Sequence, residues 1–199
     1  MKLVVGLFFS FFLLGCTQVD NYRYSSEENL QYLTDLANNG DTEAQGLLVY
    51  IYEGRDDSFS QAEAVKWYQK LAEKGVLNAQ ILLADRYLTG KGVSQNYPEA
   101  IRWYTEAANK NSDIAQFQLA KIYINGRGVR QDYNKAFKLL TLSANQNNSE
   151  AQILLASAYF QGQGVQKNSA AAKHWFGVAC DNQNAMGCEG YKLLNMNGF

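Results

Sequence analysis

Residues 79–111 read AQILLADRYLTGKGVSQNYPEAIRWYTEAANKN, and near copies of this stretch fill most of the chain on either side. One copy begins at Ala115 and the next at Ala151, so an Ala-Gln pair recurs every 36 residues. A fixed period of this length is typical of proteins in which one structural unit stacks on the next. The sequence therefore predicts a solenoid.

Each copy contains two apolar patterns of helical period. In the first half, Ala79, Leu83 and Tyr87 stand four residues apart, which places them along one face of a helix. Between the halves, Gly90-Lys91-Gly92-Val93 supplies the left-handed backbone that ends a helix. We therefore expect an antiparallel pair, helix A and helix B. Helix B carries the i, i+3, i+4, i+7, i+8 stripe of a buried face at Ala100, Trp103, Tyr104, Ala107 and Ala108.

The repeated pattern A-x3-L-A-x2-Y-x2-G-x-G-V, followed by A-x2-W-Y/F-x3-A-A, resembles the Sel1-like repeat family, a relative of the tetratricopeptide repeats. The resemblance covers residues 27–199. It implies an all-α, right-handed superhelical solenoid of antiparallel helix pairs that binds other proteins. Two features depart from the family pattern. Leu139-Leu140 replaces Trp-Tyr in one unit, and alanine replaces the usual glycine at Ala84, Ala120 and Ala156.

The repeat register predicts the organisation of the chain. We expect four repeats in residues 41–184, an N-terminal capping helix in 27–40 and a C-terminal capping helix in 185–199. Ala37 precedes Ala44 by seven residues, as in the later repeats, so the first cap is a solitary helix B. The loop at 53–59 is one residue short and lacks the second glycine. It is either a drifted terminal repeat or an acidic contact loop.

Residues 1–15 contain the apolar run LVVGLFFSFFLLG, which is typical of a signal-peptide core. The run ends at Cys16 and resembles a bacterial lipobox, which implies cleavage and lipidation of Cys16. The alternative is an ordinary signal peptide followed by a chance cysteine. Thr17, rather than aspartate, implies the outer membrane, facing the periplasm. Residues 16–26 then form a polar tether.

Two cysteines remain in the repeat region, Cys180 and Cys188. They lie in the last turn of one predicted helix and the first turn of the next, close enough for a disulfide, and an exported protein meets an oxidising compartment. The spacing also resembles that of cysteine-rich Sel1-like proteins. A metal site would need more ligands than this region offers, so we expect a disulfide and no metal.

Composition and motifs point away from catalysis. The net charge of −1 does not suit nucleic-acid binding. The single histidine, His174, has no nucleophile at a fixed spacing, and the Gly-Lys-Gly turns do not match a P-loop. We expect no catalytic residue and no cofactor. The enzymatic alternative is a weak β-lactamase-like activity, as described for cysteine-rich relatives, although the S-x-x-K motif is absent.

The predicted partner surface lies on helix A, where the alanine of the Ala-Gln pair is counted as position 0. Positions 2 and 6 lie opposite the Ala-Leu-Tyr face, where an amphipathic helix would be polar. Several are instead large and apolar, and such rows commonly line the concave side of a solenoid. The alternative is that these side chains pack between repeats. The predicted partner-binding residues are Tyr50, Ile81, Asp85, Phe117, Lys121 and Ile153.

These features lead to a functional expectation. The chain is expected to be a non-enzymatic lipoprotein of the bacterial envelope that binds another protein. Small Sel1-repeat lipoproteins resemble immunity proteins that neutralise lipase or phospholipase effectors of type VI secretion. The alternative is a scaffold or regulator of envelope assembly or signalling.

Overall fold

The computed structural model of the chain describes residues 27–196 and 198. This part of the chain forms ten α-helices and no strand, which confirms the predicted all-α class. The helices are α2 (Glu27–Asn38), α3 (Thr42–Glu53), α4 (Ser58–Glu73), α5 (Leu77–Thr89), α6 (Tyr97–Asn109), α7 (Asp113–Asn125), α8 (Tyr133–Ala144), α9 (Ser149–Gln161), α10 (Ser169–Asp181) and α11 (Ala185–Met196).

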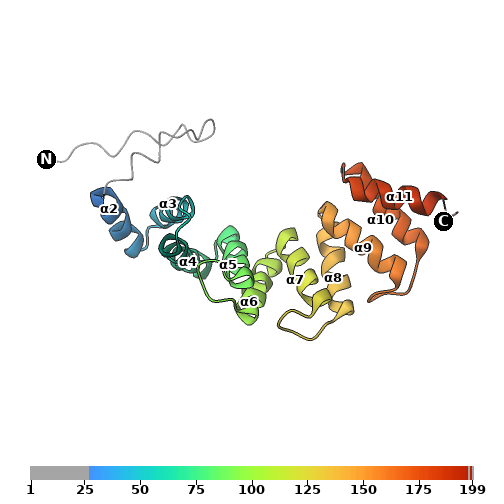
Figure 1. The fold of residues 1–199 in the computed structure, drawn as a ribbon, viewed down its shortest axis with the longest axis horizontal. Helices are drawn as coiled ribbons and strands as arrows, with labels where there is room; N and C mark the ends of the chain where they lie inside the picture. The colour runs from blue at the N-terminus through green and yellow to red at the C-terminus, as the bar shows by residue number, and fades with distance from the viewer. Residues whose placement is uncertain (1–26, 197, 199) are drawn as a thin grey trace.

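The helices form one curved row of antiparallel pairs, with α2 at one end and α11 at the other (Figure 1). The main contacts are between helices that follow one another in the chain. The A helices α3, α5 and α7 lie toward the inner side of the curve, and the B helices α4, α6 and α8 lie toward its outer side (Figure 1). The solenoid predicted from the 36-residue period is therefore confirmed.

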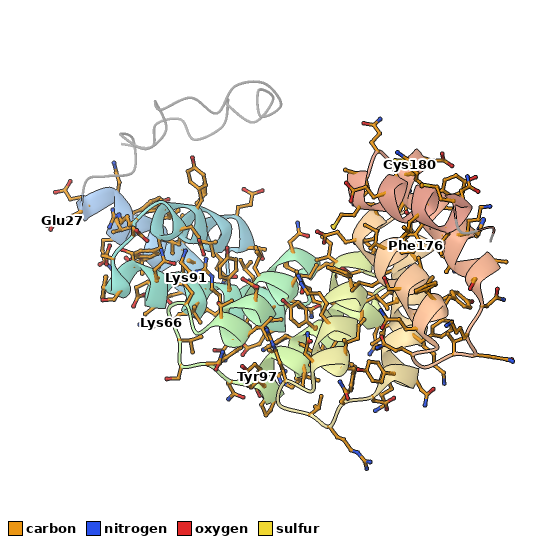
Figure 2. The ribbon with its side chains drawn as sticks, turned by 45° about the vertical axis from the view of Figure 1, so that its right-hand side comes forward. Glu27, Lys66, Lys91, Tyr97, Phe176 and Cys180 are labelled. Atoms are coloured by element: carbon orange, nitrogen blue, oxygen red, sulfur yellow. A yellow bond between two sulfur atoms is a disulfide. The ribbon has the colours of Figure 1, made fainter. Side chains whose placement is uncertain are left out.

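Glycine ends helix A because the chain turns there through a left-handed conformation. Gly90, Gly126 and Gly162 cap α5, α7 and α9 with φ of 79°, 63° and 76°. The second glycine of each loop is needed for close packing as well. A Cβ on Gly128 would run into the side chain of Tyr97, at the start of the preceding helix B (Figure 2). The loop of one repeat therefore presses directly on the repeat before it.

The glutamine of each Ala-Gln pair joins one repeat to the next. Its side chain is buried, and its Nε2 donates a hydrogen bond to a carbonyl in the last turn of the preceding helix B. The last four carbonyls of a helix have no partner within the helix, so a side-chain donor satisfies one of them. The bonds are Gln45 to Ala37 (2.8 Å), Gln80 to Ala72 (3.2 Å), Gln116 to Ala108 (3.4 Å) and Gln152 to Ala144 (3.1 Å).

The core follows the row of helices. One cluster of buried apolar side chains extends from Leu33 in α2 to Ile122 in α7, and a second from Phe117 in α7 to Leu155 in α9. Side chains project into the space between successive helix pairs (Figure 2). No helix among the described residues is long and apolar enough to cross a membrane. The predicted signal peptide, tether and lipidated Cys16 lie outside the described residues.

The irregular first loop is held by its own acidic residue. The carboxylate of Asp57 accepts hydrogen bonds from the backbone N–H (2.8 Å) and the side-chain hydroxyl (2.7 Å) of Ser60. It therefore serves as the N-cap of α4. These hydrogen bonds lower the pKa of Asp57, because they favour the charged carboxylate. Asp56 and Phe59 remain exposed beside it.

Candidate protein-binding surface

The six residues predicted to bind a partner divide into exposed and packed side chains. Tyr50, with 58% of its surface exposed, Asp85 and Lys121 all face solvent. These three stand at position 6 of helix A. The position-2 residues Ile81 and Ile153 are half-buried. Of the six predicted residues, the structure therefore exposes the three at position 6 and packs the three at position 2.

Phe117 is the residue for which the prediction of an exposed apolar anchor is wrong. Only 7% of its surface is exposed, and it belongs to the second core cluster. The Nζ of Lys121 lies 5.0 Å from the centre of its ring, on the solvent side of the cluster. The alternative interpretation, packing between repeats, holds for this side chain.

The reason lies in how helix A is surrounded. It packs against the helix B on each side of it, so its buried arc is wider than that of a helix with one neighbour. At about 100° per residue, positions −1, 3 and 6 fall within one arc of about 60°, whereas position 2 falls outside that arc. Sequence reasoning missed positions −1 and 3 because it placed the exposed face directly opposite the Ala-Leu-Tyr stripe.

We call the surface formed by positions −1, 3 and 6 of the A helices the A-face. It carries large exposed apolar side chains on three successive A helices: Tyr50 on α3, Leu82 on α5 (42% exposed) and Ile114 on α7 (48%). Asp85 and Lys121 add opposite charges beside them. The residues of the A-face are Glu43, Leu47, Tyr50, Asn78, Leu82, Asp85, Ile114, Gln118, Lys121, Glu150, Leu154 and Ser157.

A buried polar cluster lies at the boundary between the first and second repeats. The guanidinium of Arg86, in α5, donates a hydrogen bond to Oε1 of Gln61 (2.9 Å) and forms an ion pair with Glu53 at the end of α3. Its Cζ lies 5.9 Å from the ring centre of Tyr68. Burial, followed by the nearby Glu53 carboxylate, raises the pKa of Tyr68 to about 12. The cluster connects the end of α3, beside the irregular loop, to the second repeat.

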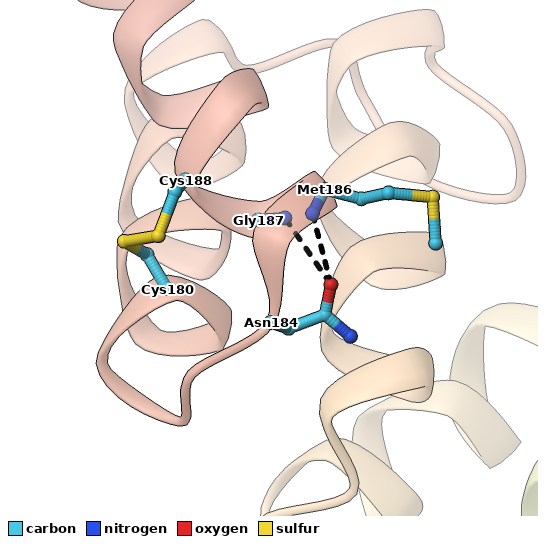
Figure 3. Close-up of a disulfide and its surroundings, with 5 residues drawn as sticks. All are labelled: Cys180, Asn184, Met186, Gly187 and Cys188. Carbon is cyan, nitrogen blue, oxygen red and sulfur yellow. Dashed lines mark hydrogen bonds between the residues drawn. A yellow bond between two sulfur atoms is a disulfide. The ribbon is translucent and has the colours of Figure 1, made fainter.

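The predicted disulfide is present. Cys180 in the last turn of α10 is bonded to Cys188 in the first turn of α11, with a Cα–Cα distance of 4.4 Å (Figure 3). Between them, Oδ1 of Asn184 accepts hydrogen bonds from the backbone N–H groups of Met186 (3.1 Å) and Gly187 (3.4 Å). The bridge therefore closes a capped turn that attaches the last helix.

The side chains that were considered for catalysis or metal binding do not form a site together in the described part of the chain. His174 is exposed on α10, and its ring lies edge-on to Trp175 with centroids 5.5 Å apart. Within the described residues, no group of three or more His, Cys, Asp or Glu side chains could hold a metal ion. The arrangement that the structure does offer is an extended, partly apolar surface on stacked helices.

Comparison with known proteins identifies the repeat. The Sel1 repeat model matches residues 49–76, 77–112, 113–148 and 149–184. The chain belongs to the Sel1 repeat family. Each of the last three matches covers one A helix and the following B helix of this Sel1-repeat protein. Such repeats form a protein-interaction fold, so the expectation of a protein-binding solenoid is supported at that level. Among curated proteins, none matches the sequence.

Solved structures show the same architecture. A protective antigen of uropathogenic Escherichia coli with an SLR fold is 32% identical, with a TM-score of 0.78 over 85% of this chain. This Sel1-repeat chain spans 37% of that protein's length. A Sel1 repeat protein from Oxalobacter formigenes is 26% identical, with a TM-score of 0.66 over 79% of this chain and 71% of that one. Cysteine-rich protein B of Helicobacter pylori shares the fold, with 24% identity and a TM-score of 0.54 over 68% of this chain and 98% of that one.

Proposed function

We propose that this Sel1-repeat protein is a non-enzymatic binding protein that holds a protein partner against the A-face. The observation that supports this most directly is that three successive A helices each carry one large, exposed side chain on this face, namely Tyr50, Leu82 and Ile114. Large side chains with charged neighbours are the composition in which binding energy concentrates at protein interfaces. In the described part of the chain, no group of three or more His, Cys, Asp or Glu side chains is placed to hold a catalytic metal ion.

The partner in this proposal is a lipase or phospholipase effector of type VI secretion, and the protein is its immunity protein. One feature of the sequence and one of the fold support this assignment. The lipobox ending at Cys16 suggests an anchor in the envelope, facing the periplasm, where such an effector attacks lipid. A stoichiometric inhibitor also needs only a complementary surface and the correct location, which a rigid solenoid face can provide.

The A-face can be tested with a matched pair of leucines. Leu82 lies on the A-face and Leu142 lies on helix α8, and their exposed fractions are 42% and 51%. Each is replaced by alanine, and the variants are compared in capture of a partner from envelope extracts, identified by mass spectrometry. We expect Leu82→Ala to weaken capture at least tenfold and Leu142→Ala to leave it unchanged. Equal effects of the two variants would exclude the A-face as the binding surface.

The identity of the partner decides between the functional alternatives. A captured lipase that loses activity when the purified protein is added at equal concentration supports the immunity role. A captured assembly or signalling protein would favour the scaffold or regulator instead. Nitrocefin hydrolysis that follows the pure protein and disappears in His174→Ala would contradict the non-enzymatic part of the proposal.

The proposed anchor has its own test. Cys16→Ser should accumulate as an unprocessed precursor, because the lipobox cysteine is both the site of acylation and the residue after the cleavage point. Metabolic labelling with a fatty acid should mark the wild-type protein and not the variant. Equal labelling of the two would mean that Cys16 carries no lipid.

A further inference from the structure

A pocket of about 230 Å³ lies between helices α7, α8 and α9. Its walls are mostly apolar, and they come from Phe137 and Leu140 in α8 and from Leu154 and Ala158 in α9. Ser157, Gln161 and Gln163 add neutral polar groups, and none of the lining residues is charged. We call this cavity the α8 pocket.

The repeat rows explain why a pocket is found at this boundary. Leu140 occupies the helix B position that holds Tyr68, Tyr104 and Phe176 in the other repeats. Tyr68 approaches Arg86 at position 7 of the next helix A, and Leu140 lines the same pocket as Ala158, so the two rows lie near each other at both of these boundaries. At the boundary between α8 and α9, position 7 is Ala158. The same position holds Ile51, Arg86, Ile122 and Leu194 elsewhere.

Leu140 and Ala158 are together the smallest pair that these two rows supply at any boundary between a helix B and the next helix A. Close packing is the rule inside proteins, so an undersized pair at one boundary leaves space that the neighbours do not fill. An apolar cavity of about 150 Å³ is large enough to hold a benzene ring. The α8 pocket therefore has room for one phenyl or branched aliphatic group.

The position of the pocket connects it with the proposed binding surface. Leu154 and Ser157 line the pocket and also stand at positions 3 and 6 of α9, which belong to the A-face. A group that enters from the A-face would leave water for apolar walls, and the uncharged rim favours a neutral group over an ion.

We propose that the α8 pocket receives one compact apolar side chain, a phenylalanine or a branched aliphatic residue, from the protein that docks on the A-face. This inference rests on the proposed function, because the partner supplies the side chain. Such an anchor in a pocket is the arrangement that concentrates binding energy at an interface. Recognition would then combine a broad contact over α3, α5 and α7 with one inserted side chain at α8.

The pocket can be tested without the partner. The probe is N-acetyl-L-phenylalanine amide, and N-acetylglycine amide is the control ligand. Binding to the full-length protein is followed through the NMR signals of the Ala136 and Ala158 methyl groups, which lie in the pocket wall. We expect saturable shifts with the phenylalanine amide and none with the glycine amide. Absence of saturable shifts, or equal shifts with both amides, would overturn the inference.

Variants that fill the pocket give the matched comparison. Ala158→Ile and Leu140→Tyr each restore the residue type found in another repeat, and Ala170→Ile adds the same side chain at an exposed site on α10. We expect both filling variants to weaken probe binding at least tenfold and Ala170→Ile to leave it unchanged. Thermal melting identifies any variant that does not fold. If one filling variant does not fold, probe binding to the other filling variant tests the inference.

The remaining outcomes separate the inference from the proposed function. Binding of toluene without binding of the phenylalanine amide would overturn a side chain as the natural occupant. If a folded filling variant captures the partner as well as the wild type does, insertion of a partner side chain into the pocket is excluded. The role of the A-face is tested separately, by the comparison of Leu82→Ala with Leu142→Ala. Loss of both probe binding and partner capture in the folded filling variants supports the anchor.

Discussion

At the scale of single residues, the same chemical type has opposite roles at neighbouring positions of helix A. Phe117 at position 2 is buried between repeats, whereas Tyr50 at position 6 faces solvent. The difference comes from the angle of each position about the helix axis, since both residues are large and aromatic. Arg86 shows the converse, because a charged residue is buried at a position where α3 and α7 carry isoleucine.

The burial of Phe117 predicts its effect on stability. Removing a buried phenyl group leaves a cavity, so Phe117→Ala should lower the free energy of unfolding by about 3–5 kcal/mol. Lys121→Ala, the control on the same helix, should change it by less than about 1 kcal/mol, because it removes only an exposed cation over the ring. Urea denaturation measures both. A Phe117→Ala variant with the wild-type midpoint would contradict the burial of this ring.

Tyr68 predicts how stability responds to alkaline pH. A tyrosine has a usual pKa of about 10, and burial raises that of Tyr68 to about 12 in the folded protein. The folded state therefore holds this proton more tightly than the unfolded state does. The resulting stabilisation is fully present below pH of about 10 and is lost as the pH rises toward about 12. Burial also raises the pKa of Tyr104, which acts in the same direction.

The contribution of Tyr68 can be isolated by substitution. Tyr68→Phe has no phenolic proton to lose, so its free energy of unfolding should fall less steeply between pH 10 and 12 than that of the wild type. Urea denaturation at several alkaline pH values gives these slopes. Equal slopes for Tyr68→Phe and wild type would show that the Tyr68 hydroxyl does not titrate as its burial requires.

At the scale of elements, the disulfide takes the place of a hydrogen bond. Cys180 stands in the row of Ala72, Ala108 and Ala144, whose carbonyls accept from the buried glutamines. Cys188 stands in the row of those glutamines. The same junction between helix B and the next helix A is therefore closed by a side-chain hydrogen bond in four places and by a covalent bond in the fifth.

This equivalence predicts that glutamine can partly replace the disulfide. Cys180→Ala with Cys188→Ser should lower the free energy of unfolding by about 2–3 kcal/mol, because the bridge closes a short loop. Cys180→Ala with Cys188→Gln should recover about 1 kcal/mol of that loss, the typical net contribution of a hydrogen bond. The two double variants differ only at residue 188, so denaturation under identical conditions compares them directly. Equal stabilities would mean that the last junction does not reproduce the geometry of the others.

At the scale of the whole molecule, each helix depends mainly on its neighbours in the chain. Stability in such a row is the sum of local terms, so a defect at one end has little effect at the other. The ends are also where each terminal helix lacks a partner. On α2, Tyr32 stands in the row of the buried Trp67 and Trp103 but is 64% exposed, because no helix A precedes it in the described part of the chain.

Reduction of the disulfide should therefore loosen one end only. Amide hydrogen exchange in α10 and α11 should accelerate at least tenfold under reducing conditions, while exchange in α5 and α6 should stay within twofold of its original rate. Mass spectrometry of exchanged peptides measures both regions in one sample. Uniform acceleration along the chain would indicate a single cooperative unit instead of a row of local ones.

The sequence by itself determined the repeat, the helix pairs, the glycine turns and the position of the disulfide. These features depend on contacts within one unit or across one turn. Local patterns in the sequence indicate them directly: the Ala-Leu-Tyr rows, the Gly-x-Gly-Val loops and the spacing of Cys180 and Cys188. The family resemblance added a role in protein binding. The partner and the lipid anchor stay predictions.

Only the tertiary structure decided which side of helix A meets solvent and where space remains between repeats. Position 2 looked exposed when helix A was considered alone, but helices on both sides of it enclose Phe117. Leu140 and Ala158 are ordinary core residues when each is considered alone, and they line a pocket because stacking brings this undersized pair to the same boundary. Both results depend on the angle at which one repeat packs on the next. That angle cannot be read from the residues of one repeat alone.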